Sequence, residues 1–260
     1  MPQPSICELC LKEKRLQKSH YIPAALYPKN AKLEFHGRAT VTRIVRHMKS
    51  PLLCFDCEQL LTQNGESEVL LRVAPKLAKK GTFPLHEKLR LALPREDHPE
   101  LKRYAGYEVG LDMDKFAYFM LSLVWRGAVH AWPKPDGGFS TQLPLNEFTE
   151  PIRRYLLGEA PFPPNTSVIV IVCTDDLSRK MWIPPTDIWE TGCLNFRFHA
   201  LGVFFRAMMG RNLPLFYRDA SCTSPYKWIA MGDCALRTQE VFDVLEAMRA
   251  REQRGGSRGL

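Results

Sequence analysis

Apolar residues in the second half of the chain recur at the spacing of helices. Five of them fall on one face of a helix at about 116–124, and Asp114 is placed to cap its N-terminus. A second helix is predicted over 145–157, ending at Gly158. The segment 237–251 is amphipathic and also predicts a helix, followed by a Gly-rich tail that we expect to be disordered.

Strand patterns lie between these predicted helices. The continuous apolar run at 167–173 is typical of a buried strand. Residues 196–200 and 203–208 predict two strands joined by a turn at Leu201-Gly202. Helices and strands together predict an α+β domain over residues 104–260.

The first 103 residues lack this long periodicity and divide into two parts. Residues 1–70 contain two closely spaced cysteine pairs. Residues 71–103 are basic and punctuated by proline, which predicts a connecting arm with one short helix. The expected fold class is therefore α+β, with a small N-terminal module ahead of a larger domain.

Charge is distributed unevenly along the chain. The net charge is +8, and residues 1–50 carry 10 Lys and Arg against 3 acidic residues. Residues 104–260 carry 17 of each sign, so the whole excess lies in the first 103 residues. A segregated positive excess indicates a polyanionic partner, although solubility alone also explains positive charge.

Two Cys-x-x-Cys pairs form the strongest motif: Cys7 with Cys10, and Cys54 with Cys57. This spacing lets both sulfurs of a pair bind one ion, and two pairs complete the four-thiolate shell of a structural zinc site. The 43 residues between the pairs exceed the usual gap, so we expect a folded segment there. Two unrelated reduced pairs are the alternative. The other four cysteines lack paired spacing and are expected to be buried thiols: Cys173, Cys193, Cys222 and Cys234.

The residues around these pairs resemble the HNH, or ββα-metal, endonuclease family in its zinc-bearing form. The resemblance rests on Ser19-His20-Tyr21-Ile22-Pro23 and on Cys54-Phe-Asp-Cys57-Glu58, and it covers about residues 4–70. It implies a zinc treble-clef module in which His20 is the general base that activates water. It also implies that Glu58, directly after the last cysteine, binds a catalytic divalent ion, Mg²⁺ or Mn²⁺.

This sequence departs from the family at two positions. Ser19 stands where the family usually has a stronger metal ligand, and Glu58 replaces Asn or His. Glu66 could compensate if the helix continues past Gly65, which is also a possible helix end. A loosely characterised group of bacterial proteins with the same variant is similar up to a Leu-Ser-x-x-Trp-Arg helix, here residues 121–126. We expect Arg126 in that helix to reach a backbone carbonyl or an acid.

The leading hypothesis is a metal-dependent endonuclease that hydrolyses phosphodiesters, and the resemblance implies a role in bacterial defence. The expected partner is nucleic acid, DNA in preference to RNA, held by basic residues: Lys12, Lys14, Arg15, Lys18, Arg43 and Arg46. One alternative is a degenerate zinc module that binds without cutting. Another is a scaffold whose residues 104–260 bind a protein partner.

Compartment and membrane association follow from the apolar pattern. No apolar run approaches the roughly 18 residues that span a bilayer, and the first residues do not resemble a signal peptide. We therefore expect a cytoplasmic protein with reduced thiols and no membrane partner.

Overall fold

The structure of the 260-residue chain is a computed structural model. It describes residues 5–27, 34–36, 40–42, 47–74, 83–98, 101–134, 138–175, 178, 182–187 and 192–233. The predicted helix 237–251, the tail after it, and the basic residues Arg43 and Arg46 lie outside this part.

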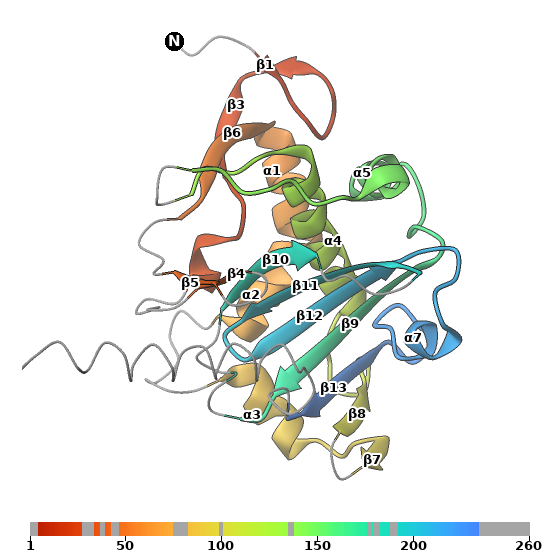
Figure 1. The fold of residues 1–260 in the computed structure, drawn as a ribbon. Helices are drawn as coiled ribbons and strands as arrows, with labels where there is room; N and C mark the ends of the chain where they lie inside the picture. Colours follow the sequence, from red (N-terminus) through yellow and green to blue (C-terminus); the bar gives the residue numbers. More distant parts are fainter. Residues whose placement is uncertain are drawn as a thin grey trace, which may run out of the picture.

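The N-terminal part is built from short strand pairs followed by a helix; β1, β3, β6 and α1 lie at the top of Figure 1. Strand β1 (Ser5–Ile6) pairs with β2 (Glu13–Lys14), and β4 (Glu34–His36) pairs with β5 (Thr40–Thr42). Strand β3 (Leu16–His20) runs antiparallel to β6 (Lys49–Cys54), and a 3₁₀ turn η1 (Ala24–Leu26) lies between them in sequence. The described residues between the two cysteine pairs therefore form regular structure, as predicted.

One continuous helical stretch follows β6. Helix α1 (Phe55–Leu61) passes through a π-helical turn, η2 (Thr62–Glu66), into α2 (Ser67–Val73). Gly65 does not end the helix. Its missing side chain instead allows a close approach to helix α4 (Met113–Val129), because an added Cβ would lie 2.9 Å from the backbone nitrogen of Phe119.

The larger part contains a seven-stranded mixed sheet with the order β10-β11-β12-β9-β13-β8-β7. All neighbours are antiparallel except β13 and β9, which are parallel. The strands are β7 (Glu96–His98), β8 (Leu101–Ala105), β9 (Thr166–Cys173), β10 (Ile183–Asp187), β11 (Leu194–Ala200), β12 (Val203–Met209) and β13 (Trp228–Gly232).

The structure confirms the strand predictions at 167–173, 196–200 and 203–208. The β11–β12 turn places Leu201 at φ 51° and Gly202 at φ 77°, the conformation of a tight hairpin turn. The predicted basic arm 71–103 does contain a short helix, α3 (Pro84–Leu91), but it also supplies β7 and the start of β8.

Helix α4 is apolar around its whole circumference and is buried on all sides. Every residue from 116 to 127 is buried, as expected for a helix packed between other elements. One side contacts η2 and the other contacts β9 and β12, where Phe119 packs on Phe205. The cap is Asp112, whose carboxylate accepts from Lys115 N, so the predicted cap Asp114 was wrong; Asp114 pairs with Lys227 instead.

The remaining helices lie at the margins. The helix predicted at 145–157 is a 3₁₀ turn η3 (Asn146–Phe148) followed by α5 (Thr149–Leu156), and Gly158 follows it at φ 74°, as predicted. A short α7 (Leu215–Asp219) precedes β13.

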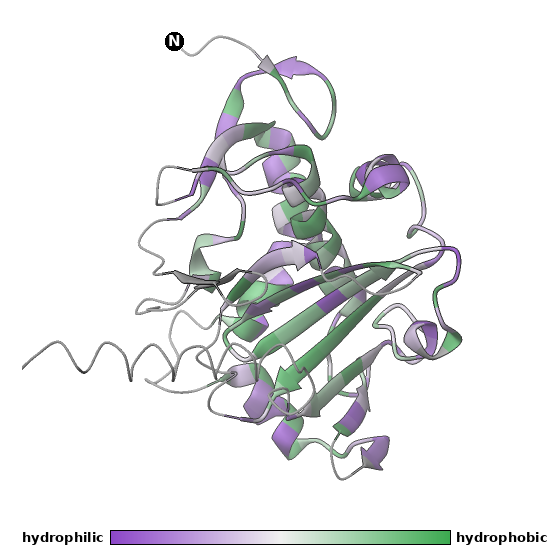
Figure 2. Cartoon of the chain, viewed as in Figure 1, coloured by the Kyte–Doolittle hydropathy of each residue, from purple (hydrophilic) through white to green (hydrophobic). Residues whose placement is uncertain are grey.

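Hydrophobic side chains form one cluster that extends from Cys7 in the N-terminal part to Met231 in the sheet. Figure 2 shows the apolar colour concentrated along α4 and the central strand β9. Among the described residues, no helix is both long and apolar enough to cross a bilayer. The observed fold class is α+β.

Candidate metal centre and the polar cluster beside it

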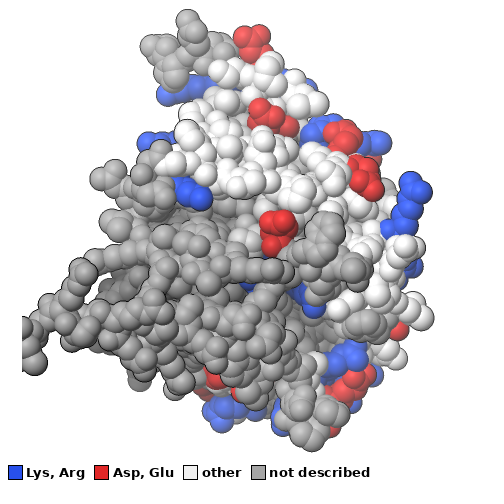
Figure 3. Space-filling view, viewed as in Figure 1, with Lys and Arg blue, Asp and Glu red and all other residues white. Residues whose placement is uncertain are grey.

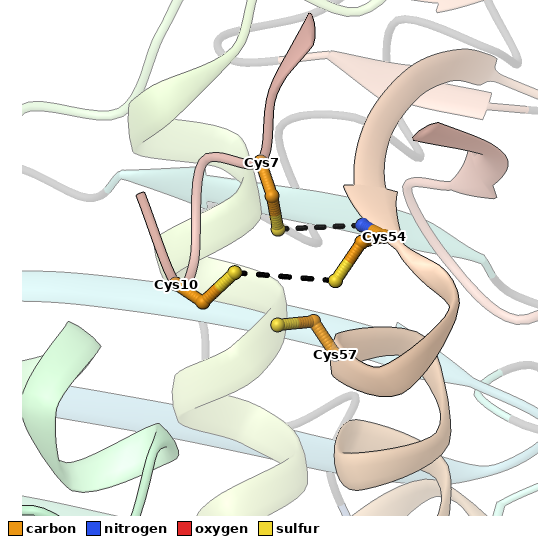
Figure 4. A group of neighbouring side chains, drawn as sticks. All are labelled: Cys7, Cys10, Cys54 and Cys57. Atoms are coloured by element: carbon orange, nitrogen blue, oxygen red, sulfur yellow. Dashed lines mark hydrogen bonds between the residues drawn. The ribbon is translucent and has the colours of Figure 1, made fainter. Parts of the chain in front are cut away.

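One turn, the end of a strand and the start of a helix bring the four predicted cysteines together. Cys7 and Cys10 lie in the turn between β1 and β2, Cys54 ends β6, and Cys57 is in the first turn of α1. All four sulfurs lie within 4.8 Å of one another, and the Cys10 and Cys54 sulfurs are 3.9 Å apart (Figure 4). Tetrahedral bonds of about 2.3 Å would separate sulfurs by about 3.8 Å, so this arrangement can hold a metal ion.

Hydrogen bonds within the cluster favour the thiolate form of Cys7. The amide of Cys54, at the start of α1, donates to the Cys7 sulfur at 3.3 Å. The hydrogen bond from the Cys57 thiol, together with backbone amides, lowers the pKa of Cys7 to about 4. The same hydrogen bond raises the pKa of Cys57, which keeps its proton. A bound metal ion would favour the deprotonated form of all four cysteines. A four-sulfur donor set suits a borderline or soft metal ion.

A second polar cluster adjoins the cysteines. Glu58 follows Cys57 on α1, and Glu66 lies eight residues on, at the end of η2. Residues eight apart in an uninterrupted α-helix differ by about 80° around the axis; the extra residue of the π turn reduces this to about 20°. The π turn therefore puts both carboxylates on one face, toward α4.

Arg126 of α4 meets these two carboxylates. Its Nη1 lies 2.7 Å from Oε1 of Glu66, and its Nη2 lies 3.7 Å from Oε2 of Glu58. The Arg126 side chain is only 1% exposed. Removing one partner of a buried ion pair typically costs about 3–5 kcal/mol, because the other charge is left buried and uncompensated. The expectation that Arg126 reaches an acid is confirmed.

His20, at the end of β3 opposite Lys49, lies near the same cluster. Its pKa is lowered, first by burial and then by the positive charges of Lys49, His47 and Arg126, while Glu66 opposes the shift. The ring of His47 is 5.8 Å away between centroids. The imidazole is therefore neutral at neutral pH and has a lone pair free to accept a proton.

Four buried polar atoms of this cluster have no hydrogen-bond partner within the described part of the chain: Nε2 of His20, Oε1 of Glu58, Oε1 of Glu66 and Nε of Arg126. Of these, Oε1 of Glu66 still has the charge of Arg126 Nη1 at 2.7 Å. Buried polar atoms are nearly always paired in folded proteins, with protein, water or an ion. Their concentration here marks a place where water, a cation or a ligand is expected.

Ser19 does not join this cluster. Its side chain is buried, with the residue 2% exposed, and its hydroxyl accepts a hydrogen bond from the backbone nitrogen of Leu53 at 3.2 Å. Ser19 and His20 are successive strand residues, so their side chains point to opposite faces. Ser19 therefore braces β3 on β6.

The predicted phosphate-binding residues are only partly available. Lys14 forms an ion pair with Asp56 at 2.6 Å, whereas Lys12, Arg15 and Lys18 are exposed. On the face in Figure 3, the described Lys and Arg side chains are interspersed with acidic ones and form no large patch of one sign.

Sequence reasoning did not predict that Cys173 is disulfide-bonded. Cys173 is buried but disulfide-bonded, so the expectation of a reduced, buried thiol there was wrong. Cys222 is a buried thiol, as expected; Cys193 is half-buried and is not in a disulfide, and Cys234 lies outside the described residues. A disulfide depends on how close two Cα atoms come in the fold, and spacing along the chain does not reveal this.

Comparison with known protein families, curated proteins and solved structures finds no match to this chain. What the site does is therefore inferred from its residues and their geometry.

Proposed function

We propose that this chain is a metal-dependent endonuclease of the HNH type, with a zinc-bearing treble-clef module. The observation that carries the proposal is the set of unpartnered buried atoms beside the cysteines, Nε2 of His20 and Oε1 of Glu58. One is a proton acceptor and the other a hard oxygen ligand, which are the two groups that water activation beside a divalent ion requires.

We assign the zinc ion to Cys7, Cys10, Cys54 and Cys57, because four thiolates form a closed shell that leaves no position for a substrate. Its role is then structural. The ion fixes the end of β6 and the start of α1, and thereby the position of Glu58 next to Cys57.

We assign a Mg²⁺ or Mn²⁺ ion to Glu58, with Glu66 as a second carboxylate. Two carboxylates and one arginine leave a formal charge of −1 in the cluster, which attracts a cation. When bound, a divalent ion polarises a phosphate and stabilises the leaving oxygen. His20 takes the proton of the attacking water, because its lowered pKa keeps it unprotonated at neutral pH.

The Glu58 side chain is 22% exposed, so the cluster is open to solvent on that side. The exposed Arg15 directly follows β2, and the exposed Lys18 lies in β3, two residues before His20. Both would contact the phosphate backbone outside the cluster. Nucleic acid is thus the proposed substrate, with DNA preferred.

A second function is favoured by one observation: Arg126 already neutralises one carboxylate at 2.7 Å. A cluster compensated in this way can serve as a structural joint in a zinc module that binds nucleic acid without cutting. The test is to incubate the purified chain with plasmid, single-stranded DNA and RNA, with Mn²⁺, with Mg²⁺ and with chelator. Cutting that requires a divalent ion supports the nuclease; binding without cutting under every condition selects the second function.

A further inference from the structure

Arg126 contacts the proposed catalytic carboxylates from a distant segment of the chain. It lies on α4, whereas Glu58 and Glu66 belong to the helical stretch of the cysteine-bearing part. Its two terminal nitrogens face different carboxylates, Nη1 toward Glu66 and Nη2 toward Glu58. A guanidinium is charged at every physiological pH, and its planar fork sets the angle between the groups that it binds.

Two glycine contacts fix α4 at this site. At Gly65, a Cβ would approach the Phe119 backbone nitrogen to 2.9 Å, so only glycine lets η2 and α4 come this close. At Gly127, directly after Arg126, a Cβ would lie 2.3 Å from the hydroxyl of Tyr21, the residue after His20. These two close approaches fix the position of helix α4 relative to Glu66 on one side and relative to the end of β3 on the other.

We infer that Arg126 is a positioning residue for the proposed nuclease site, contributed by the larger part of the chain: its fork sets the orientation of Glu58 and Glu66 that turnover requires, while its charge opposes the binding of the catalytic cation. The inference rests on the proposed function. It makes the site incomplete in the N-terminal 70 residues alone. The N-terminal part supplies the four zinc ligands and His20. The larger part supplies Arg126, which orients the carboxylates.

Charge and orientation act in opposite directions here, which makes the role testable. Arg126 repels a cation at the carboxylates, so its removal should tighten cation binding. Arg126 also sets the carboxylate geometry, so its removal should slow turnover. A purely structural arginine would show neither effect, or would lose fold, cation binding and turnover together.

The experiment uses the full-length chain as wild type, Arg126→Met and Arg126→Lys, with Arg153→Met as the matched control. Arg153, on α5, also joins the two parts, because its Nη1 donates to the carbonyl of Leu9 at 2.7 Å, but it does not contact Glu58 or Glu66. Each protein is checked for metal content and circular dichroism. Mn²⁺ affinity is measured by titration without nucleic acid, and kcat and KM are measured with plasmid.

We expect Arg126→Met to bind Mn²⁺ at least about five-fold more tightly, because one nearby positive charge is gone. We expect its kcat to fall about 10²-fold with little change in KM, as for a displacement of about 1 Å in a catalytic group. Arg126→Lys keeps the charge but not the fork, so Mn²⁺ affinity should stay near wild type while kcat falls. Arg153→Met should leave both quantities unchanged.

Unchanged Mn²⁺ affinity in Arg126→Met would overturn the inference, whether or not the chain cuts nucleic acid. Tighter Mn²⁺ binding with an unchanged kcat would overturn the positioning role alone. If Arg126→Met does not fold, Arg126→Lys decides, and wild-type turnover in that variant contradicts the inference.

A wild type that binds Mn²⁺ but cuts nothing rejects the proposed function, while the affinity change still shows whether Arg126 lies beside the cation site. A wild type that binds no Mn²⁺ rejects both.

Discussion

Substitutions of Ser19 distinguish two roles for this position, that of a metal ligand and that of a structural contact between β3 and β6. The resemblance to HNH endonucleases implies that Asp at this position would add a ligand and raise activity. In the structure, the Ser19 hydroxyl accepts from Leu53 N at 3.2 Å and the residue is 2% exposed. An aspartate here would carry its charge into the contact between β3 and β6, where water does not reach it.

The magnitude follows from this one hydrogen bond. Ser19→Ala leaves the buried amide of Leu53 without its acceptor, which costs about 1–3 kcal/mol. For a chain of this size each kcal/mol lowers Tm by roughly 2–4 °C, so we expect a decrease of about 2–12 °C. Ser19→Asp retains an acceptor but buries a carboxylate, and we expect it to destabilise at least as much as Ser19→Ala.

The assay is thermal and urea denaturation of wild type, Ser19→Ala and Ser19→Asp, together with Mn²⁺ titration. Lys18→Asp is the control, because it adds the same carboxylate one residue earlier on the same strand, at an exposed position where changes stay within about 0.5 kcal/mol. A Ser19→Asp protein with wild-type Tm and tighter Mn²⁺ binding would refute the reasoning, since Ser19 would then have to face the cluster.

Three further predictions concern the zinc ion, the base and the nucleic-acid contact. Cys54→Ser should lose bound metal and, because structural zinc supplies of order 10 kcal/mol, should unfold residues 1–70; a metal-free wild type on elemental analysis contradicts the zinc site. The rate should rise with pH as His20 loses its proton, with its midpoint below the ordinary histidine pKa of about 6.5, since burial lowers the pKa of His20; a midpoint above pH 7 would exclude His20 as the base. Binding should weaken steeply with salt, and Arg15→Gln with Lys18→Gln should reduce that slope more than Lys14→Gln, whose lysine is already paired with Asp56; equal slopes would contradict the assignment.

The sequence predicted the cysteine cluster because Cys-x-x-Cys spacing is a local property that survives any fold around it. The strands at 167–173 and 196–208 were predictable for a similar reason, since a run of apolar residues and a Leu-Gly turn act through neighbours in the chain. The fold class followed from these patterns. The domain boundaries at about residues 70 and 103 remain a prediction.

What sequence could not give depends on contacts between distant segments. The π turn that aligns Glu58 with Glu66 arises where Gly65 meets α4, and no local pattern distinguishes such a glycine from a helix end. The direction of Ser19 depends on the register of β3 against β6. The meeting of Arg126 with both carboxylates required α4 to be placed beside η2, although an arginine inside an apolar helix already signalled that an acid would be nearby.

The central claim is that His20 is the base of a divalent-ion-dependent phosphodiesterase. The most direct measurement is plasmid cleavage by wild type and His20→Ala in Mn²⁺ and in chelator, with His130→Ala, a histidine at the C-terminal end of α4, as the control. The account predicts cleavage by wild type and His130→Ala in Mn²⁺ only, and a rate about 10²–10⁴-fold lower for His20→Ala with binding retained. Cleavage that is undiminished in His20→Ala, or absent from wild type while nucleic acid and Mn²⁺ both bind, would contradict it.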